Sequence, residues 1–159
     1  MSAKTIRVAM IGVGGVCAQV HFPGFSRIPG VDIVGICDPN ASLREIRCKE
    51  WRVEASFGDV DELLLEIKPD AVVIATPNCT HKSLILKAFA SGSHVLCEKP
   101  LGMNLQETKE ILEVAQKTQL RHMTAFTYRF VPAMNYIRHL VRTGALGEIR
   151  HARFQRLQD

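Results

Sequence analysis

Short apolar runs rich in Ile and Val alternate along the chain with longer segments in which apolar residues recur at helical spacing. The apolar runs predict strands over residues 5–11, 31–37, 54–57, 71–75, 93–97 and 121–126. The helical patterns predict helices over residues 16–27, 42–50, 59–67, 81–91, 104–117 and 132–142. Apolar strands separated by helices are typical of a parallel sheet that is covered on both faces. We therefore expect an α/β fold built on a doubly wound parallel sheet.

Three of the predicted helices begin with a capping box, in which a polar side chain accepts a hydrogen bond from a backbone N–H at the start of the helix. The pairs are Ser42 with Glu45, Asp59 with Glu62, and Asn104 with Glu107. Pro23 is expected to kink or shorten the first helix, because proline lacks the N–H that the helical ladder uses.

The last stretch, ALGEIRHARFQRLQD, looks like the start of a strand with nothing after it to form a partner. We expect residues 1–125 to form a nucleotide-binding domain. Residues 126–159 would then form a crossover helix and the beginning of a second, truncated α/β domain. The alternative is that this stretch is a frayed basic tail.

Charge and cysteine content narrow the choice of partners and compartment. The excess of 20 basic over 16 acidic residues is small and has no run of five like charges, so neither a nucleic acid nor a membrane is indicated as partner. The apolar run after Arg7 is diluted by glycines, so a secretion signal is not expected. Five cysteines without a C-x-x-C pair predict neither a disulfide framework nor a metal site, and they fit the reducing cytoplasm.

A glycine-rich turn follows the first predicted strand and has the order Gly12-Val13-Gly14-Gly15-Val16-Cys17. It nearly matches the G-x-G-x-x-G fingerprint of dinucleotide-binding proteins, with Cys17 in place of the third glycine. Gly12 permits the tight turn, and Gly14 lets the backbone approach a pyrophosphate at the start of the helix. Residues 12–16 are therefore candidate cofactor contacts.

An acidic residue, Asp38, ends the second predicted strand 21 positions after Cys17. Its carboxylate is placed to accept hydrogen bonds from the adenosine ribose, and it would repel a 2′-phosphate, so NAD is favoured while NADP stays possible. Pro39 follows it, and Arg44 is a candidate phosphate contact. Two alternatives stay open: an S-adenosylmethionine site, which uses a similar strand, glycine loop and acid, and a glycine turn without a ligand.

The loop after the fourth predicted strand carries Thr76, Pro77 and Asn78. Ligands of doubly wound sheets bind at the carboxyl ends of the strands, so these residues are candidate cofactor contacts. His81 begins the next helix and is included among the candidates. Taken alone, it fits a residue that bonds to the loop better than a catalytic base.

Taken together, these motifs resemble the Gfo/Idh/MocA family of nicotinamide-dependent oxidoreductases from Ile6 to about Ile149. The resemblance rests on VAMIGVGGVCAQVHFPGF, ICDP, VVIATPNCTH, HVLCEKPLGMNLQE, YRFVPAM and RTGALGEI. It implies a Rossmann domain followed by a larger α/β domain that binds substrate and usually supplies a histidine in a D-x-x-x-H segment. No such segment occurs here. We therefore expect the cofactor-binding half of such an enzyme.

The resemblance also implies a role for the E-K-P element, Glu98-Lys99-Pro100. The lysine of this element lies near the nicotinamide and the substrate, where an ammonium stabilises negative charge on the reacting oxygen. Lys99 is thus the candidate catalytic residue. Glu98 would anchor the cofactor or hold Lys99 by charge, and Pro100 would set the turn, through a cis bond. Arg129 would contact a phosphate, the nicotinamide or the substrate, or form an interdomain ion pair.

The function expected from these residues is hydride transfer between NAD(P) and a sugar, cyclitol or related polyol. Such a protein would use a small-molecule polyol as substrate and could form a homo-oligomer. Two alternatives stay open: a cofactor-binding module or truncated product without catalysis, and an S-adenosylmethionine methyltransferase. The methyltransferase offers no reason for the E-K-P element.

Overall fold

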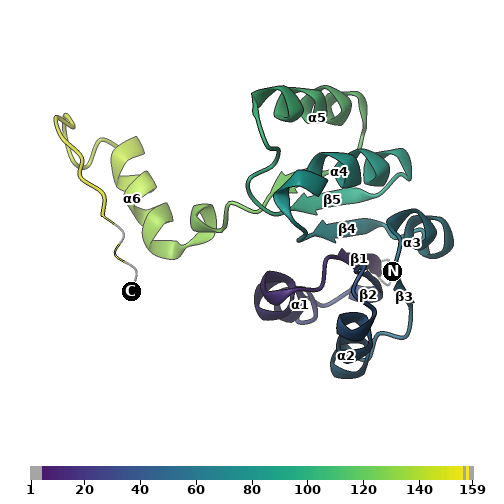
Figure 1. Cartoon of the computed structure of the whole chain (residues 1–159). Coiled ribbons are helices and arrows are strands. Elements are labelled where there is room, and N and C mark those ends of the chain that lie inside the picture. Colours follow the sequence, from purple (N-terminus) through teal and green to yellow (C-terminus); the bar gives the residue numbers. More distant parts are fainter. Residues whose placement is uncertain (1–4, 156, 158–159) are drawn as a thin grey trace. The chain divides into compact units, whose positions relative to one another are not determined.

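A computed structural model describes residues 5–155 and 157 and contains a six-stranded parallel sheet (Figure 1). The strand order is β3-β2-β1-β4-β5-β6, and every pairing is parallel. The strands are β1 (Ile6–Ile11), β2 (Val31–Cys37), β3 (Ser56–Phe57), β4 (Ala71–Ile74), β5 (His94–Cys97) and β6 (His122–Thr124). The predicted doubly wound parallel sheet is therefore confirmed.

Helices follow the strands in the expected alternation. They are α1 (Phe22–Phe25), α2 (Ala41–Trp51), α3 (Val60–Ile67), α4 (His81–Ala90), α5 (Leu105–Lys117) and α6 (Pro132–Arg142). Short helical turns lie at Cys17–His21, which is π-helical, and at Asn78–Thr80 and Thr127–Phe130, which are 3-10 turns. Pro23 lies in α1, which continues the π-helical turn Cys17–His21 without a break and ends at Phe25, two residues before the predicted end at Arg27. The first helix is thus irregular and shorter than predicted, as expected of a proline that lacks the N–H of the helical ladder.

Two of the predicted helix caps are confirmed and one is wrong. Asp59 accepts hydrogen bonds from the backbone N–H groups of Asp61 and Glu62, and Asn104 caps α5. Ser42 lies inside α2, and the cap is Asn40, whose side chain accepts the Leu43 N–H at 3.0 Å. The physical reason is the extended backbone at Asn40, with φ −79° and ψ 104°, which starts the helix one residue before Ser42.

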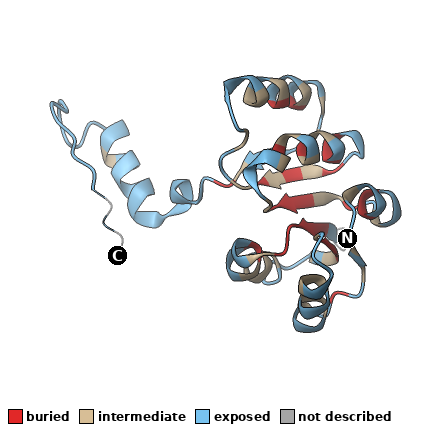
Figure 2. Cartoon of the chain, in the orientation of Figure 1, coloured by how far each residue is buried: buried red, intermediate tan, exposed pale blue. Residues whose placement is uncertain are grey.

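The core lies on both faces of the sheet (Figure 2). Alternate side chains of β1 supply both sides, since successive residues of a strand point to opposite faces. Ala9 and Ile11 belong to the cluster that includes Leu63 of α3 and Ile85 of α4. Val8 and Met10 belong to the other cluster, which includes Val13, Cys17 and Ile36, with Leu43 and Trp51 of α2 packed against it. Burial on both faces explains why these strands are continuously apolar.

Backbone contacts divide the chain into two compact units, one ending at Ala125 and one beginning at Phe126. The described side chains of α6 in the second unit are mostly exposed (Figure 2). The expected strand start after Ala145 is wrong for residues 145–155, which form turns and irregular backbone without a strand partner. Within the described ranges, no helix is both long and apolar enough to cross a bilayer.

Candidate functional site

The carboxyl ends of four neighbouring strands lie in register at one edge of the sheet. Ile11 pairs with Cys37 on one side and with Ile74 on the other, and Ile74 pairs with Cys97. The residues that follow these strand ends, Gly12, Asp38, Ala75 and Glu98, are therefore brought to the same edge. This is the edge at which open α/β sheets bind ligands.

The glycine turn at this edge requires glycine at one position and has open space beside two others. Gly12 has φ +82°, and a Cβ there would lie 2.5 Å from the Ala75 carbonyl oxygen. A Cβ on Gly14 or Gly15 would meet no atom within 4 Å. The turn is thus tight against β4 on one side and open on the other. The open side fits a bulky group at the start of the following helix, where backbone N–H groups are unpaired within the helix.

Asp38 holds the glycine turn in place. Its Oδ2 accepts the Val13 N–H at 3.1 Å, and its Oδ1 accepts the Asn40 N–H at 2.9 Å. A carboxylate has about four lone-pair sites, so two of them stay available for ribose hydroxyls. Arg44, a candidate phosphate contact, instead donates from Nη1 to the Asp38 carbonyl oxygen at 2.6 Å.

Arg47 is a functional candidate that the sequence patterns do not indicate. Its Nε donates to the Val13 carbonyl oxygen at 3.1 Å, and its guanidinium lies 5.5 Å from the centre of the Trp51 ring. Trp51 in turn stacks on Phe22, with ring centroids 4.2 Å apart. Both polar groups of the Val13 backbone are therefore fixed by charged side chains, Asp38 and Arg47. Val13 contributes to the turn through its backbone, since its side chain is buried.

The loop after β4 is held by hydrogen bonds within the loop and is partly exposed. The Thr76 and Thr80 hydroxyls lie 2.7 Å apart, and Thr80 also donates to the Pro77 carbonyl oxygen at 2.7 Å. Pro77 and Asn78 are exposed at the sheet edge, as a cofactor contact requires. The Thr76 methyl lies against the turn at Gly12, since a Cβ on Gly12 would be 2.7 Å from it.

His81 is fully buried and joins two loops. Its Nδ1 lies 2.8 Å from the Pro100 carbonyl oxygen, and its Nε2 lies 3.0 Å from the Thr76 carbonyl oxygen. A carbonyl oxygen only accepts, so each contact is a hydrogen bond when that nitrogen carries a proton. The side chain therefore connects the two loops and has no nitrogen turned toward the open edge. The loop-bonding interpretation of His81 matches this geometry.

The E-K-P element follows β5 and leaves Lys99 exposed at the edge. The Lys99–Pro100 peptide bond is cis, as expected. Glu98 was expected to anchor the cofactor or to hold Lys99 by charge. In the structure it holds the backbone of Lys99: Oε2 accepts the Lys99 backbone N–H at 3.1 Å. Its Oε1 lies 2.9 Å from Nε2 of the buried His21, which the sequence patterns did not single out.

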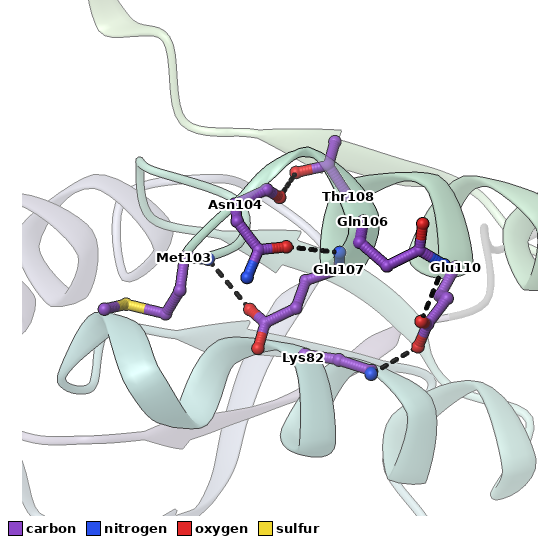
Figure 3. A network of polar contacts seen from close by, with 7 residues as sticks. All are labelled: Lys82, Met103, Asn104, Gln106, Glu107, Thr108 and Glu110. Atoms are coloured by element: carbon purple, nitrogen blue, oxygen red, sulfur yellow. Dashed lines mark hydrogen bonds and ion pairs between the residues drawn. The ribbon is translucent and has the colours of Figure 1, made fainter.

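The chain beyond Lys99 is fastened to α5 (Figure 3). Asn104 accepts the Glu107 N–H at 2.9 Å, and the Glu107 carboxylate accepts the Met103 N–H at 2.8 Å. An ion pair joins Lys82 of α4 to Glu110 of α5. The segment that follows the E-K-P element is thus held at the start of α5, and α5 is joined to α4.

Burial makes the thiols near the sheet edge unreactive. Burial raises the pKa of Cys17 to about 12, and the nearby Arg47 only partly opposes this shift. Burial likewise raises the pKa values of Cys37 and Cys97 to about 12. None of these three thiols is a nucleophile at neutral pH, since only the thiolate reacts.

Arg129 belongs to the second unit. Its guanidinium lies 5.1 Å from the centre of the Phe126 ring. It lines an open cleft of about 490 Å³ together with Tyr128, Met134, Asn135 and Arg138. Two guanidinium groups in one cleft suit an anionic or hydroxyl-rich group.

Comparison with known proteins agrees with this geometry. Residues 6–126 match the family model GFO_IDH_MocA, described as an oxidoreductase family with an NAD-binding Rossmann fold. The chain is 32% identical to the D-glucoside 3-dehydrogenase of Escherichia coli, over 94% of this chain and 42% of that protein.

Two solved structures share the fold. A scyllo-inositol dehydrogenase from Lactobacillus casei with bound NAD(H) and scyllo-inositol has a TM-score of 0.85 and 28% identity, over 91% of this chain and 43% of the other. The 3-ketoreductase KijD10 from Actinomadura kijaniata, in complex with TDP-benzene and NADP, has a TM-score of 0.83 and 26% identity, over 92% and 46% of the two chains. The chain thus spans less than half the length of each of these three proteins.

Proposed function

The chain belongs to the Gfo/Idh/MocA family of oxidoreductases with an NAD-binding Rossmann fold, and on that premise we propose that it forms the cofactor-binding part of an enzyme that transfers hydride between NAD and a sugar or cyclitol. The observation that carries this proposal is the register of the strand ends. It brings the glycine turn, Asp38 and the E-K-P lysine to one edge of the sheet.

The residues of the sheet edge fit a dinucleotide. The open side of Gly14 and Gly15, followed by Val16 at the start of a helix, accommodates a pyrophosphate. Asp38 receives the adenosine ribose, with Pro39 beside it, and Thr76, Pro77 and Asn78 line the path toward the nicotinamide. Because the Asp38 carboxylate would repel a 2′-phosphate, we assign NAD as the preferred cofactor.

Lys99 is the proposed catalytic residue. When bound, the nicotinamide supplies the hydride acceptor or donor. When a carbonyl substrate is reduced, the Lys99 ammonium, exposed at the same edge, stabilises the negative charge that develops on the substrate oxygen and gives it a proton. When an alcohol is oxidised, the neutral Lys99 amine takes up the hydroxyl proton and becomes the ammonium. The backbone of Lys99 is fixed by Glu98 on one side and by the His81 contact to Pro100 on the other. Preorganisation of this kind lets the ammonium act without rearrangement.

The second unit is the proposed start of a substrate domain. Residues 126–159 carry α6 and the cleft around Arg129 and Arg138, which suits a polyol hydroxyl or a phosphate. The relatives include dehydrogenases named for a glucoside and an inositol, which supports a sugar or cyclitol substrate. The five free cysteines support a reducing compartment such as the cytoplasm.

A titration of the purified chain with NADH tests the proposal. Nicotinamide fluorescence should rise saturably with NADH, and S-adenosylmethionine should not compete. Gly14→Val is the matched variant, because its branched side chain enters the open side of the turn while the sheet stays intact. We expect its NADH affinity to fall at least about tenfold, or about 1.4 kcal/mol. Absence of saturable NADH binding by the unsubstituted chain would overturn the proposal.

A further inference from the structure

A contact between the side chains of His21 and Glu98 joins the segment after the glycine turn to the E-K-P element. The two residues are 77 positions apart, and Nε2 of His21 lies 2.9 Å from Oε1 of Glu98. Their side chains are 6% and 13% exposed, so water screens the contact little. The contact fixes the orientation of a Glu98 carboxylate that is mostly shielded from water.

His21 comes from the helical turn that follows the glycine loop directly. The π-helical segment Cys17–His21 starts with the buried Cys17 and ends with His21. π-helical turns in proteins are frequent at functional sites, because they redirect side chains that a regular helix would place elsewhere. Here the turn carries the imidazole from the end of β1 past β4, which lies between β1 and β5, to the end of β5. The glycine loop and the E-K-P element are thereby joined.

Both oxygens of the Glu98 carboxylate are used in this arrangement. Oε1 faces His21, and Oε2 accepts the backbone N–H of Lys99 at 3.1 Å. The carboxylate therefore fixes the Lys99 backbone while its charge is directed toward His21. Without His21, Oε1 of this carboxylate would lack its partner, one residue away from a lysine ammonium. Opposite charges at such close range attract each other.

We propose that His21 is a positioning residue: by engaging Glu98 it keeps that carboxylate from pairing with the Lys99 ammonium, and it links the cofactor loop to Lys99. The inference rests on the proposed function, since it concerns how Lys99 is presented to the nicotinamide. His21 touches neither cofactor nor substrate in this role. Its effect passes entirely through Glu98.

The test measures how bound NADH shields Lys99 from acetylation by N-acetoxysuccinimide, read by mass spectrometry of the digested chain. With NADH at ten times its dissociation constant, we expect the rate at Lys99 to fall about fivefold or more. Lys117, in the last turn of α5, is the internal control and should change little.

Three variants separate positioning from general damage. His21→Ala should still bind NADH, but shielding of Lys99 should fall to within about twofold of none, because Glu98 then holds the ammonium. His21→Gln keeps a donor near the position of Nε2 and should retain most of the shielding. The double variant His21→Ala/Glu98→Gln removes the competing charge and should recover shielding, a rescue that loss of packing alone does not predict. Should His21→Ala fail to fold, His21→Asn replaces it, because its amide is too short to reach Glu98.

The outcomes distinguish a failure of the proposed function from a failure of the role proposed for His21. No NADH binding by the unsubstituted chain, or binding without shielding of Lys99, would remove the proposed function itself. Binding with strong shielding that persists in His21→Ala would sink the role of His21 and leave the proposed function standing. Failure of the double variant to recover shielding would also count against the role of Glu98 as a competing partner.

Discussion

Asp38 accepts the backbone N–H of Val13 at 3.1 Å, across 25 residues of sequence. The carboxylate that the proposed function assigns to the adenosine ribose therefore also supports the glycine turn. One side chain thus joins two parts of the proposed cofactor site. A substitution of Asp38 consequently changes both the charge at the ribose and the support of the glycine turn. The choice of replacement separates these two effects.

Asp38→Asn should lower the preference for NAD over NADP. The amide oxygen can still accept the Val13 N–H, so the glycine turn is retained, while the Asn40 N–H loses its acceptor and the charge that repels a 2′-phosphate is gone. We expect the ratio of NADP to NAD affinity to rise about tenfold, equal to about 1.4 kcal/mol. Asp38→Ala should weaken both cofactors further, because the turn also loses its support. Fluorescence titrations with NADH and NADPH measure this, and an unchanged ratio in both variants would contradict the ribose assignment.

Gly12→Ala should destabilise the fold. The new Cβ would lie 2.5 Å from the Ala75 carbonyl oxygen, and the backbone has φ +82°, a region that alanine adopts poorly. Strain and overpacking together should lower the free energy of unfolding by about 3 kcal/mol, measured in urea.

Gly15→Ala is the matched control for Gly12→Ala, since a Cβ on Gly15 meets no atom within 4 Å. Its unfolding free energy should stay within about 0.5 kcal/mol of the unsubstituted chain. Equal losses in both variants would show that the approach of the turn to β4 is looser than the structure indicates.

His81→Leu should loosen the connection between the loops after β4 and β5. The Thr76 and Pro100 carbonyl oxygens would lose their partner, and we expect a loss of about 2 kcal/mol in unfolding free energy. His81→Gln, which retains a donor, should lose less. Amide hydrogen exchange around residues 76–80 and 98–102 should speed up in His81→Leu, while exchange in β1 should stay slow.

How well the sequence predicts a contact of this fold and site depends on how many residues separate the two partners along the chain. The sheet was predictable because β1 and β4 are apolar on both faces, a local signal of a buried parallel strand. Asp38 was predictable because its distance from the glycine turn is set by one β-α-β unit. His21 and Arg47 were not, because their partners lie 77 and 34 residues away and nothing local marks them. The cap at Asn40 was missed because Ser42 and Glu45 offer the same local pattern.

The buried thiols make stability fall at alkaline pH. The pKa of Cys17 is raised from 9.0 to about 12 in the folded chain, because burial disfavours the thiolate. A raised pKa in the folded state contributes stability that is fully present below pH 9. That stability is lost between pH 9 and about pH 12, because the unfolded thiol ionises in this range while the folded one stays protonated.

Between pH 8 and pH 10, each such thiol should therefore lower the free energy of unfolding by about 1 kcal/mol. Cys17→Ala isolates one of them: its stability should decline less over this interval than that of the unsubstituted chain, by about the same amount. Urea unfolding at the two pH values, followed by far-ultraviolet circular dichroism, measures the difference. Cys79→Ala is the matched control, because Cys79 is exposed and its replacement should leave the pH dependence unchanged. Identical declines in Cys17→Ala and Cys79→Ala would mean that the Cys17 thiol ionises as readily in the folded chain as in the unfolded one.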